Sequence, residues 1–361
     1  MGVRQAGREQ AGYLPALDGL RGVAVILVFL VHTYADYLPG GFVGVDLFFA
    51  ISGYLITDLL LKESAAFGRP SVSRFYLRRA LRILPALFVM VAATAILLPW
   101  TITGGSDSGV LNTAAALFGF MNWLRAFTPA SGLALGHTWS LGVEEQFYAI
   151  WVLCILACSG QHARRTVFAL ALGGIVLVTV WRGHLLANGA SAARLFNGLD
   201  TRGDALLVGC VLAAIPARSG VLAAAYRLWP LPIAGLTIIA FTTAWNAPWL
   251  LMGGFTVVAL CSGWLVHLAS QAEGTLVRPL SNRWLLWLGK RSYSFYLWHL
   301  PVIAALSSSG MQRSLWILPA LALSMLLAAA SYHFVELPFL HLKTGFTIQR
   351  ARLAKPAPDP L

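Results

Sequence analysis

The stretch from Leu20 to Leu61 decides the fold, and it reads LRGVAVILVFLVHTYADYLPGGFVGVDLFFAISGYLITDLLL. Two apolar runs, Leu20 to Tyr37 and Phe42 to Leu61, lie on either side of a Pro-Gly-Gly break. Each run is close to the roughly 20 residues that an α-helix needs to cross the hydrocarbon core of a bilayer. The stretch therefore predicts two consecutive membrane-spanning helices.

The whole chain is as apolar as this stretch. Of its 361 residues, 58% are apolar and 11% are charged, and the mean hydropathy is +0.72. A soluble domain carries about a quarter charged residues, so this composition excludes a soluble enzyme, a disordered chain and a fibrous protein. Roughly 200 apolar residues correspond to about ten spans. We expect an all-α, polytopic transmembrane helical bundle in which residues 1–340 form a single membrane domain, followed by a short basic cytoplasmic tail, 341–361.

Glycine, proline and charged residues delimit the apolar runs along the chain. A weaker patch, Leu111 to Trp123, is too short to span and is expected to be a re-entrant or interfacial segment. The ten predicted spans are Leu20–Tyr37, Phe42–Leu61, Ile83–Trp100, Ser140–Cys158, Val167–Leu186, Ala205–Ala217, Leu228–Ala244, Trp249–Leu268, Ser292–Ser308 and Leu315–Val335.

The excess of basic residues predicts how the chain is oriented in the membrane. The net charge of +12 comes from 26 Lys and Arg against 14 Asp and Glu, and in a soluble protein it would indicate a nucleic-acid partner. Cytoplasmic loops of membrane proteins are themselves rich in Lys and Arg, so no nucleic acid is expected here. With both termini cytoplasmic, 20 of the 26 basic residues fall on inner segments. The outer segments hold five, Arg125, Arg182, Arg194, Arg202 and Arg313, and Arg21 at the mouth of the first span completes the 26.

Two ionisable residues, Arg21 and His32, lie within the first predicted span, where a charged side chain is unfavourable. An ionisable side chain inside a span costs roughly 2.5 to 3.5 kcal/mol on insertion scales. The two lie 11 residues apart. That separation is three helical turns plus about 20°, so both leave the same face of the helix about 16 Å apart. A snorkelling arginine and a hydrogen-bonded core histidine are the structural alternative, whereas a neutral imidazole could serve as a general base.

Two carboxylates are expected at the depth of His32. By the predicted span boundaries Asp46, Glu144 and His32 each lie about five residues, or roughly 7 Å, below the outer surface. A carboxylate that orients an imidazole would help it to take a proton from a hydroxyl group. Either acid could also serve only to satisfy a buried histidine, and spacing does not separate the two roles.

At the inner surface the run Arg74, Arg78, Arg79 and Arg82 precedes the third span. If the run is helical, the i, i+4, i+8 spacing directs most of its charge one way. Forked guanidinium groups suit phosphate. A polybasic anchor on anionic lipid headgroups is the alternative.

Seven phrases of this sequence resemble, in order, the successive motifs of the acyltransferase-3 family of integral-membrane O-acyltransferases. The resemblance covers about residues 14 to 340. The phrases are LDGLRGVAVILVFLVH (17–32), GGFVGVDLFFAISGYLIT (40–57), FYLRRALRILPA (75–86), HTWSLGVEEQFY (137–148), GDALLVGCVLA (203–213), LGKRSYSFYLWHLPV (288–302) and SYHFVELPF (331–339).

The resemblance implies an acyltransferase of the kind that moves groups other than aminoacyl groups. It would transfer an acyl group, commonly acetyl, from acyl-coenzyme A to a hydroxyl of a saccharide or of a glycosylated natural product such as a macrolide. The implied catalytic residues are His32 as general base with Asp46 or Glu144 orienting it. The family's motifs also fall on Arg21, Arg79 and Arg82, which would bind the donor, and on Trp139 and Ser140. From their positions in the sequence we add Arg78 to the expected donor-binding residues, and we expect Trp139, Ser140, Tyr293 and His299 to contact the acceptor.

The resemblance also bears on the domain content of the protein and on its location in the cell. Many members carry a further periplasmic hydrolase-like domain, and this chain resembles the stand-alone form. High Ala, Gly and Arg usage favours a bacterial source, so we expect a multi-pass protein of the cytoplasmic (inner) membrane in contact with lipids. The four cysteines lie in apolar runs without C-x-x-C spacing, so no metal is expected. His333 stands where a basic residue is common in the family, a small departure.

Two other classes of protein compete with an enzyme. A proton-coupled transporter or permease also places charged residues within helices, because they mark ion pathways. A non-catalytic scaffold is a third class. The arginine run and the Arg21–His32 pair favour the enzyme, since a permease needs no phosphate-binding mouth.

Overall fold

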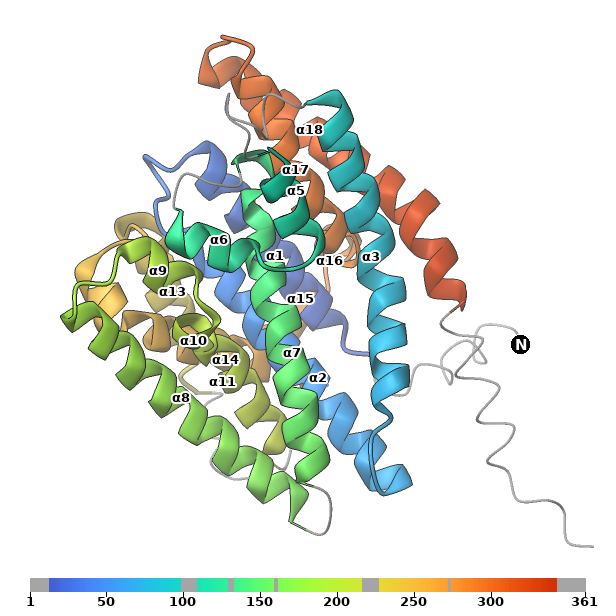
Figure 1. Ribbon diagram of the computed structural model, residues 1–361, viewed down its shortest axis with the longest axis vertical. Helices are drawn as coiled ribbons and strands as arrows, with labels where there is room; N and C mark the ends of the chain where they lie inside the picture. Colours follow the sequence, from blue (N-terminus) through green and yellow to red (C-terminus); the bar gives the residue numbers. More distant parts are fainter. Residues whose placement is uncertain are drawn as a thin grey trace, which may run out of the picture. The chain divides into compact units, whose positions relative to one another are not determined.

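The computed structural model describes residues 13–98, 109–128, 133–158, 162–215, 227–271 and 274–342, and in these ranges every regular element is helical (Figure 1). The predicted all-α class is confirmed. The elements are α1 (Pro15–Thr33), α2 (Val43–Phe67), α3 (Val72–Leu97), α5 (Gly109–Leu117), α6 (Met121–Phe127), η1 (Leu133–Thr138), α7 (Trp139–Ala157), α8 (Ala163–Ala187), α9 (Ala192–Asn197), α10 (Leu199–Arg202), α11 (Asp204–Ala214), α13 (Pro230–Thr242), η2 (Leu250–Gly254), α14 (Phe255–Ala269), α15 (Val277–Leu280), α16 (Arg283–Lys290), α17 (Ser292–Ser307), α18 (Arg313–Ser331) and η3 (Tyr332–Glu336).

Within the described ranges, seven helical segments are long and apolar enough to cross a membrane. They correspond to seven of the ten predicted spans, and the chain is a multi-pass helical membrane protein. The other three predicted spans coincide with α11, α13 and α17, which have 11, 13 and 16 residues. At about 1.5 Å per residue these helices are shorter than the hydrocarbon core of about 30 Å. The count of ten stays a prediction. So does the cytoplasmic placement of the termini, because residues 1–12 and 343–361, with nearly all of the predicted tail, lie outside the described ranges.

The first helix is displaced along the sequence from its predicted position. It begins at Pro15 and ends at Thr33, where the prediction was Leu20 to Tyr37. A turn follows it, in which the N–H groups of Tyr37 and Leu38 both bond to the carbonyl oxygen of Tyr34. Apolar residues in this turn extended the hydropathy signal beyond the real helix end. His32 therefore lies in the last turn of α1 and not five residues inside it.

The predicted re-entrant patch, Leu111 to Trp123, forms two short helices. α5 and α6 flank Gly119, whose φ of +70° lies in the left-handed region that favours glycine. The longer of them, α5, has nine residues and a length of about 14 Å, so neither helix can span a bilayer alone.

The chain packs as two compact units, each assembled from segments far apart in the sequence. Unit 1 comprises residues up to Lys62 together with Val143–Ser292, and unit 2 comprises Glu63–Gly142 together with the residues from Tyr293 onward. The predicted single domain over residues 1–340 stays a prediction.

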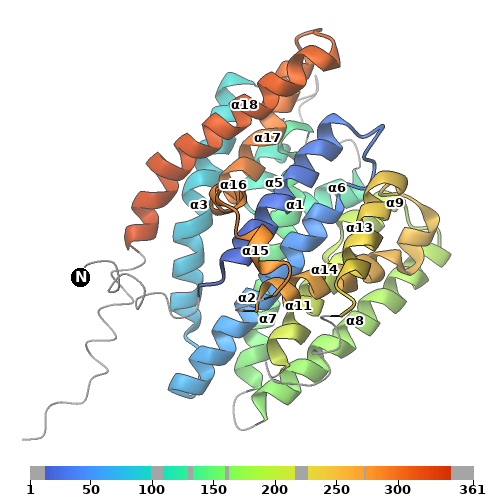
Figure 2. The same cartoon turned by 180° about the vertical axis from the view of Figure 1, so that it is seen from behind.

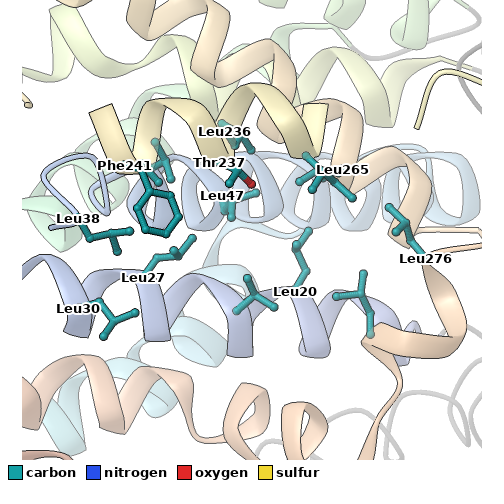
Figure 3. Close-up of a pocket in the computed structure, with 15 residues that line it drawn as sticks. Leu20, Leu27, Leu30, Leu38, Leu47, Leu236, Thr237, Phe241, Leu265 and Leu276 are labelled. Carbon is teal, nitrogen blue, oxygen red and sulfur yellow. The ribbon is translucent and has the colours of Figure 1, made fainter. Parts of the chain in front are cut away.

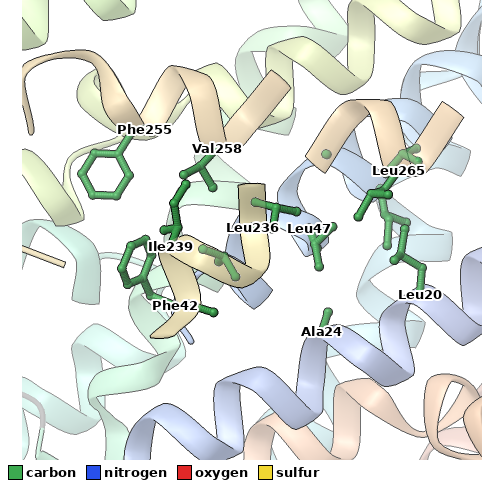
Figure 4. Packing of buried hydrophobic residues seen from close by; sticks show 14 of the residues in the cluster. Leu20, Ala24, Phe42, Leu47, Leu236, Ile239, Phe255, Val258 and Leu265 are labelled. Carbon is green, nitrogen blue, oxygen red and sulfur yellow. The ribbon is translucent and has the colours of Figure 1, made fainter. Parts of the chain in front are cut away.

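Unit 1 is built around a cluster of buried apolar side chains from α1, α2, α13 and α14. Figure 4 shows its centre, where Leu20 and Ala24 of α1 lie near Leu47, Leu236 and Leu265. In a bilayer the lipid tails are as apolar as leucine, so such contacts stabilise the bundle through close packing more than through removal from water.

Glycines allow α1 to lie directly against α15 and α16 (Figure 2). A Cβ atom at Gly19 would come within 1.8 Å of the Leu280 carbonyl oxygen, and one at Gly289 within 1.8 Å of the Asp18 carbonyl oxygen. No larger side chain fits at either position. This contact holds α15 and α16 at the Pro15 end of α1.

Candidate functional site

The predicted site residues are divided between the two units. Unit 1 carries Arg21, His32, Asp46 and Glu144. Unit 2 carries Arg78, Arg79, Arg82, Trp139, Ser140, Tyr293 and His299. Each group is described within its own unit.

His32 is exposed in the last turn of α1, so it is not a core histidine. Its Nδ1 atom lies 2.7 Å from the carbonyl oxygen of Val28, one turn earlier in the same helix. Because a carbonyl can only accept, this contact requires the proton on Nδ1 and leaves the basic lone pair of the neutral ring on Nε2. A backbone group therefore sets the tautomer that a general base needs.

Arg21 lies on the same continuous helix but already has a partner. Its Nη1 atom donates to Asp18 Oδ1 at 2.9 Å, and the Tyr13 hydroxyl donates to Asp18 Oδ2 at 2.9 Å. The two charged side chains are 17% and 13% exposed, so the pair is only partly accessible to solvent. Arg21 is held in place by Asp18, and its predicted role at the donor stays a prediction.

Asp46 is fully buried in α2 and pairs with Arg202. Arg202 Nη2 lies 3.0 Å from Asp46 Oδ1 and 3.1 Å from Oδ2. The guanidinium also lies 3.8 Å from the ring centre of Phe255 and 5.2 Å from that of Phe196. The carboxylate thus has its counter-charge. An orienting role for Asp46 at His32, like the one assigned to the half-buried Glu144, stays a prediction.

Sequence reasoning missed a second buried ion pair beside this one. Arg182 Nη1 donates to Asp204 Oδ2 at 2.8 Å and to the Thr201 carbonyl oxygen at 2.7 Å, and both charged side chains are fully buried. Thr256 accepts from Arg182 Nη2 at 2.7 Å and donates to Asp204 at 2.9 Å.

Arg182 and Arg202 were counted among the charges of the outer segments, and both side chains are completely buried. Their side of the membrane stays a prediction. Their charges are neutralised by carboxylates, so they carry no information about orientation. The available signal was the string TRGD at 201–204, which sets an arginine and an aspartate directly before an apolar run. A charge there must either be paired or leave the membrane.

The predicted helical arginine run is confirmed, since Arg74 to Arg82 all lie on α3. Glu63, a buried residue near the end of α2, lies 3.3 Å from Arg74 Nη2 and 3.5 Å from Arg78 Nη2. One carboxylate thus offsets two of the four positive charges. Arg79 is half-buried and Arg82 is exposed.

A hydroxyl and imidazole cluster in unit 2 brings together the start of α7 and α17. Ser140 Oγ lies 2.6 Å from the Tyr296 hydroxyl, which donates to the His137 carbonyl oxygen at 2.8 Å. The His137 ring lies 5.2 Å from the ring of His299, whose Nδ1 is 2.6 Å from the Tyr296 carbonyl oxygen. Ser140 and His299, both predicted acceptor residues, therefore meet through Tyr296. All four residues are buried, and so is the neighbouring Trp139.

Two other contacts of α17 hold unit 2 together. The Tyr293 hydroxyl donates to the Ile83 carbonyl oxygen of α3 at 2.8 Å. Ser294 Oγ donates to the buried Glu336 carboxylate of η3. The hydroxyl of Tyr293 is thus used in helix packing, and its predicted contact with an acceptor stays a prediction.

Comparison with known proteins identifies the family. The model of an acyltransferase domain matches residues 14–333, which include all eleven predicted site residues. The chain belongs to the acyltransferase-3 family. No solved structure matches the chain significantly.

Among curated members of this family, O-acetyltransferase OatA of Staphylococcus aureus is 33% identical over 359 residues, which cover 92% of this chain and 58% of the relative. Peptidoglycan O-acetyltransferase OatA of Listeria monocytogenes is 31% identical and covers 95% of this chain and 58% of its own length. The putative peptidoglycan O-acetyltransferase YrhL of Bacillus subtilis is 33% identical, with 90% and 55% covered. The chain thus spans little more than half the length of these relatives.

Proposed function

We propose that this protein is an O-acetyltransferase of a bacterial cytoplasmic membrane that moves the acetyl group of acetyl-coenzyme A to a hydroxyl group of a saccharide. Membership of the acyltransferase-3 family supports acyl transfer. Relatives named peptidoglycan O-acetyltransferases favour a cell-wall saccharide over a glycosylated natural product as acceptor.

The observation that carries the proposal is the arrangement of His32. With Nδ1–H bound to the Val28 carbonyl oxygen, Nε2 is the nitrogen that takes the proton of the acceptor hydroxyl. The hydroxyl oxygen then bonds to the thioester carbonyl carbon, and the carbon–sulfur bond breaks. The imidazolium returns its proton to the departing coenzyme A sulfur, so neutral His32 is regenerated.

The donor's phosphates are assigned to α3. Arg79 is half-buried and Arg82 is exposed on α3, and we assign the phosphates first to these two arginines. Guanidinium groups bind phosphate oxygens in a bidentate fashion, and a charge-assisted contact of this kind contributes more than a neutral hydrogen bond.

The decisive experiment is acetyl transfer by the purified chain in detergent. Radiolabelled acetyl-coenzyme A is supplied with peptidoglycan fragments, and product is identified by the mass of one added acetyl group. His32→Asn keeps a polar side chain but cannot take the proton, so product formation should be nearly lost. His184→Asn is the matched control, because His184 is also an exposed histidine in the last turn of a long unit 1 helix.

The alternative hypothesis, a proton-coupled transporter or permease, predicts a different result from the proposed enzyme. A proton-coupled transporter would move a solute across vesicles without producing any acetylated saccharide, and His32→Asn would abolish that movement. Transport without acylation by the wild-type protein would move it to this class.

A further inference from the structure

Unit 1 contains an elongated apolar groove between α1 and α13. Its volume is about 350 Å³, within the range of pockets that hold small ligands. Figure 3 shows Leu20, Leu27 and Leu30 of α1 on one side and Leu236 and Phe241 of α13 on the other. Thr237 supplies the one hydroxyl group among the lining side chains.

The groove runs along the membrane-spanning direction of α1. From Leu20 to Leu30 the helix rises about 15 Å, and both residues line the groove. We expect the groove to lie within the hydrocarbon layer, because α1 is one of the seven candidate spans. Water is a poor occupant of so apolar a space, whereas a hydrocarbon chain parallel to the helix fits it.

The α15 end of the groove carries the side chains expected at a membrane–water interface. Leu276 and Leu280 line this end, and α16 follows directly with the sequence RWLLWLGK. Trp284 is 67% exposed, with the Arg283 guanidinium 4.8 Å from its ring centre. Exposed tryptophan beside basic residues on a short amphipathic helix is typical of the headgroup level.

Positive charge gathers at this same end. Arg278 lies between the two lining leucines in sequence, and Arg278, Arg283 and Lys290 are all exposed. We propose that the groove holds one acyl chain of an anionic phospholipid of the surrounding bilayer, whose phosphate is bound by Arg278 and Arg283. The apolar lining binds the chain and the basic end selects the headgroup.

A structural lipid fits better here than the acyl donor or a lipid-linked acceptor. The groove-lining residues of α1 point about 150° away from Arg21 and His32 around the helix axis. The groove and the proposed base thus lie on opposite faces of α1. A lipid in the groove would pack against the face of α1 opposite His32 and would not take part in the reaction.

The test uses the full-length protein, delipidated in detergent and titrated with dioleoylphosphatidylglycerol while bound lipid is counted by native mass spectrometry. Thr237→Trp places a large ring in the groove from an exposed position. Thr242→Trp is the matched control, an exposed threonine on the same helix that does not line the groove. We expect Thr237→Trp to weaken binding at least about tenfold, since excluding only two methylene groups has that effect. Thr242→Trp should bind like the wild type.

Two further arms separate the headgroup from the chain. Arg278→Gln with Arg283→Gln should remove the preference for phosphatidylglycerol over phosphatidylcholine, whereas Arg165→Gln, an exposed arginine of α8, should keep it. Dihexanoylphosphatidylglycerol should bind far more weakly than the dioleoyl lipid.

The proposal is overturned if Thr237→Trp and Thr242→Trp bind dioleoylphosphatidylglycerol equally. It is also overturned if the ligand whose binding Thr237→Trp weakens is a polyprenyl phosphate or a long-chain acyl-coenzyme A and not dioleoylphosphatidylglycerol. None of these readouts uses acetyl transfer, so they stand apart from the proposed enzyme activity.

Discussion

Unit 1 holds ionisable residues within its helices in two contrasting arrangements. Arg182–Asp204 and Arg202–Asp46 are fully buried and paired at 2.8 and 3.0 Å. His32, in contrast, is exposed at the end of α1, and its Nδ1 is directed to a backbone carbonyl. The first arrangement uses charge to join helices, and the second leaves an imidazole accessible.

The contrast follows from the cost of burying charge. A buried ion must be paired, and the pair, once formed, is held so that its partners are unavailable to a substrate. Neutral histidine carries no such cost, so it can face a substrate without a counter-charge. Burial and pairing therefore distinguish structural from catalytic candidates among residues that look alike in sequence.

The largest effect is expected from removing the base. His32→Ala should lower kcat about 10²- to 10⁴-fold, the usual contribution of a general base, while the folded protein elutes normally from size-exclusion chromatography. The coenzyme A constant should stay within a few fold, because the imidazole does not bind phosphate. Near-normal product formation by this variant would refute the assignment.

Breaking a buried pair should instead affect folding. Arg202→Met leaves Asp46 buried without its partner, which typically costs about 3 to 5 kcal/mol. We expect a strong fall in the thermal transition of the detergent-purified protein. The double variant Arg202→Met/Asp46→Leu should recover much of that loss, because it removes the unpaired charge as well. If Arg202→Met kept full stability but lost acetyl transfer, the network would belong to the catalytic group.

The α3 arginines should show a smaller effect than either of these variants. Arg82→Ala or Arg79→Ala should raise the KM for acetyl-coenzyme A about 10- to 150-fold, since a charge-assisted contact contributes roughly 1.5 to 3 kcal/mol. The KM for the acceptor should change little. Arg74→Ala, which removes an arginine paired with Glu63, is the control and should leave the donor constant nearly unchanged. Equal shifts in both constants would favour the lipid-anchor interpretation.

The smallest effect is expected at Arg21. Its pair with Asp18 is 17% and 13% exposed, which lies between surface pairs, worth about 0 to 1 kcal/mol, and the fully buried pairs. Arg21→Ala should therefore lower the thermal transition less than Arg202→Met does and weaken donor binding by a few fold. Titration calorimetry with coenzyme A measures the second effect. A large loss of stability would place Arg21 with the buried pairs.

Local sequence was enough for much of the fold and part of the site. Apolar runs of membrane length located seven spanning segments, since hydrophobicity and helix length are properties of a single stretch of chain. The spacing of Arg21 and His32 places both on one helix, because the helical repeat needs no tertiary contact. The helical arginine run of α3 follows for the same reason.

Only the tertiary structure decided how the charges are used. Asp46 and Arg202 are separated by 156 residues, so no local pattern could reveal that they meet. The same holds for Arg182 with Asp204 and for the groove between α1 and α13. Sequence determines which residues enter the membrane through their own hydrophobicity. Which of the charged ones are neutralised and which stay accessible depends on packing between distant segments, because pairing is a property of two positions and not of one.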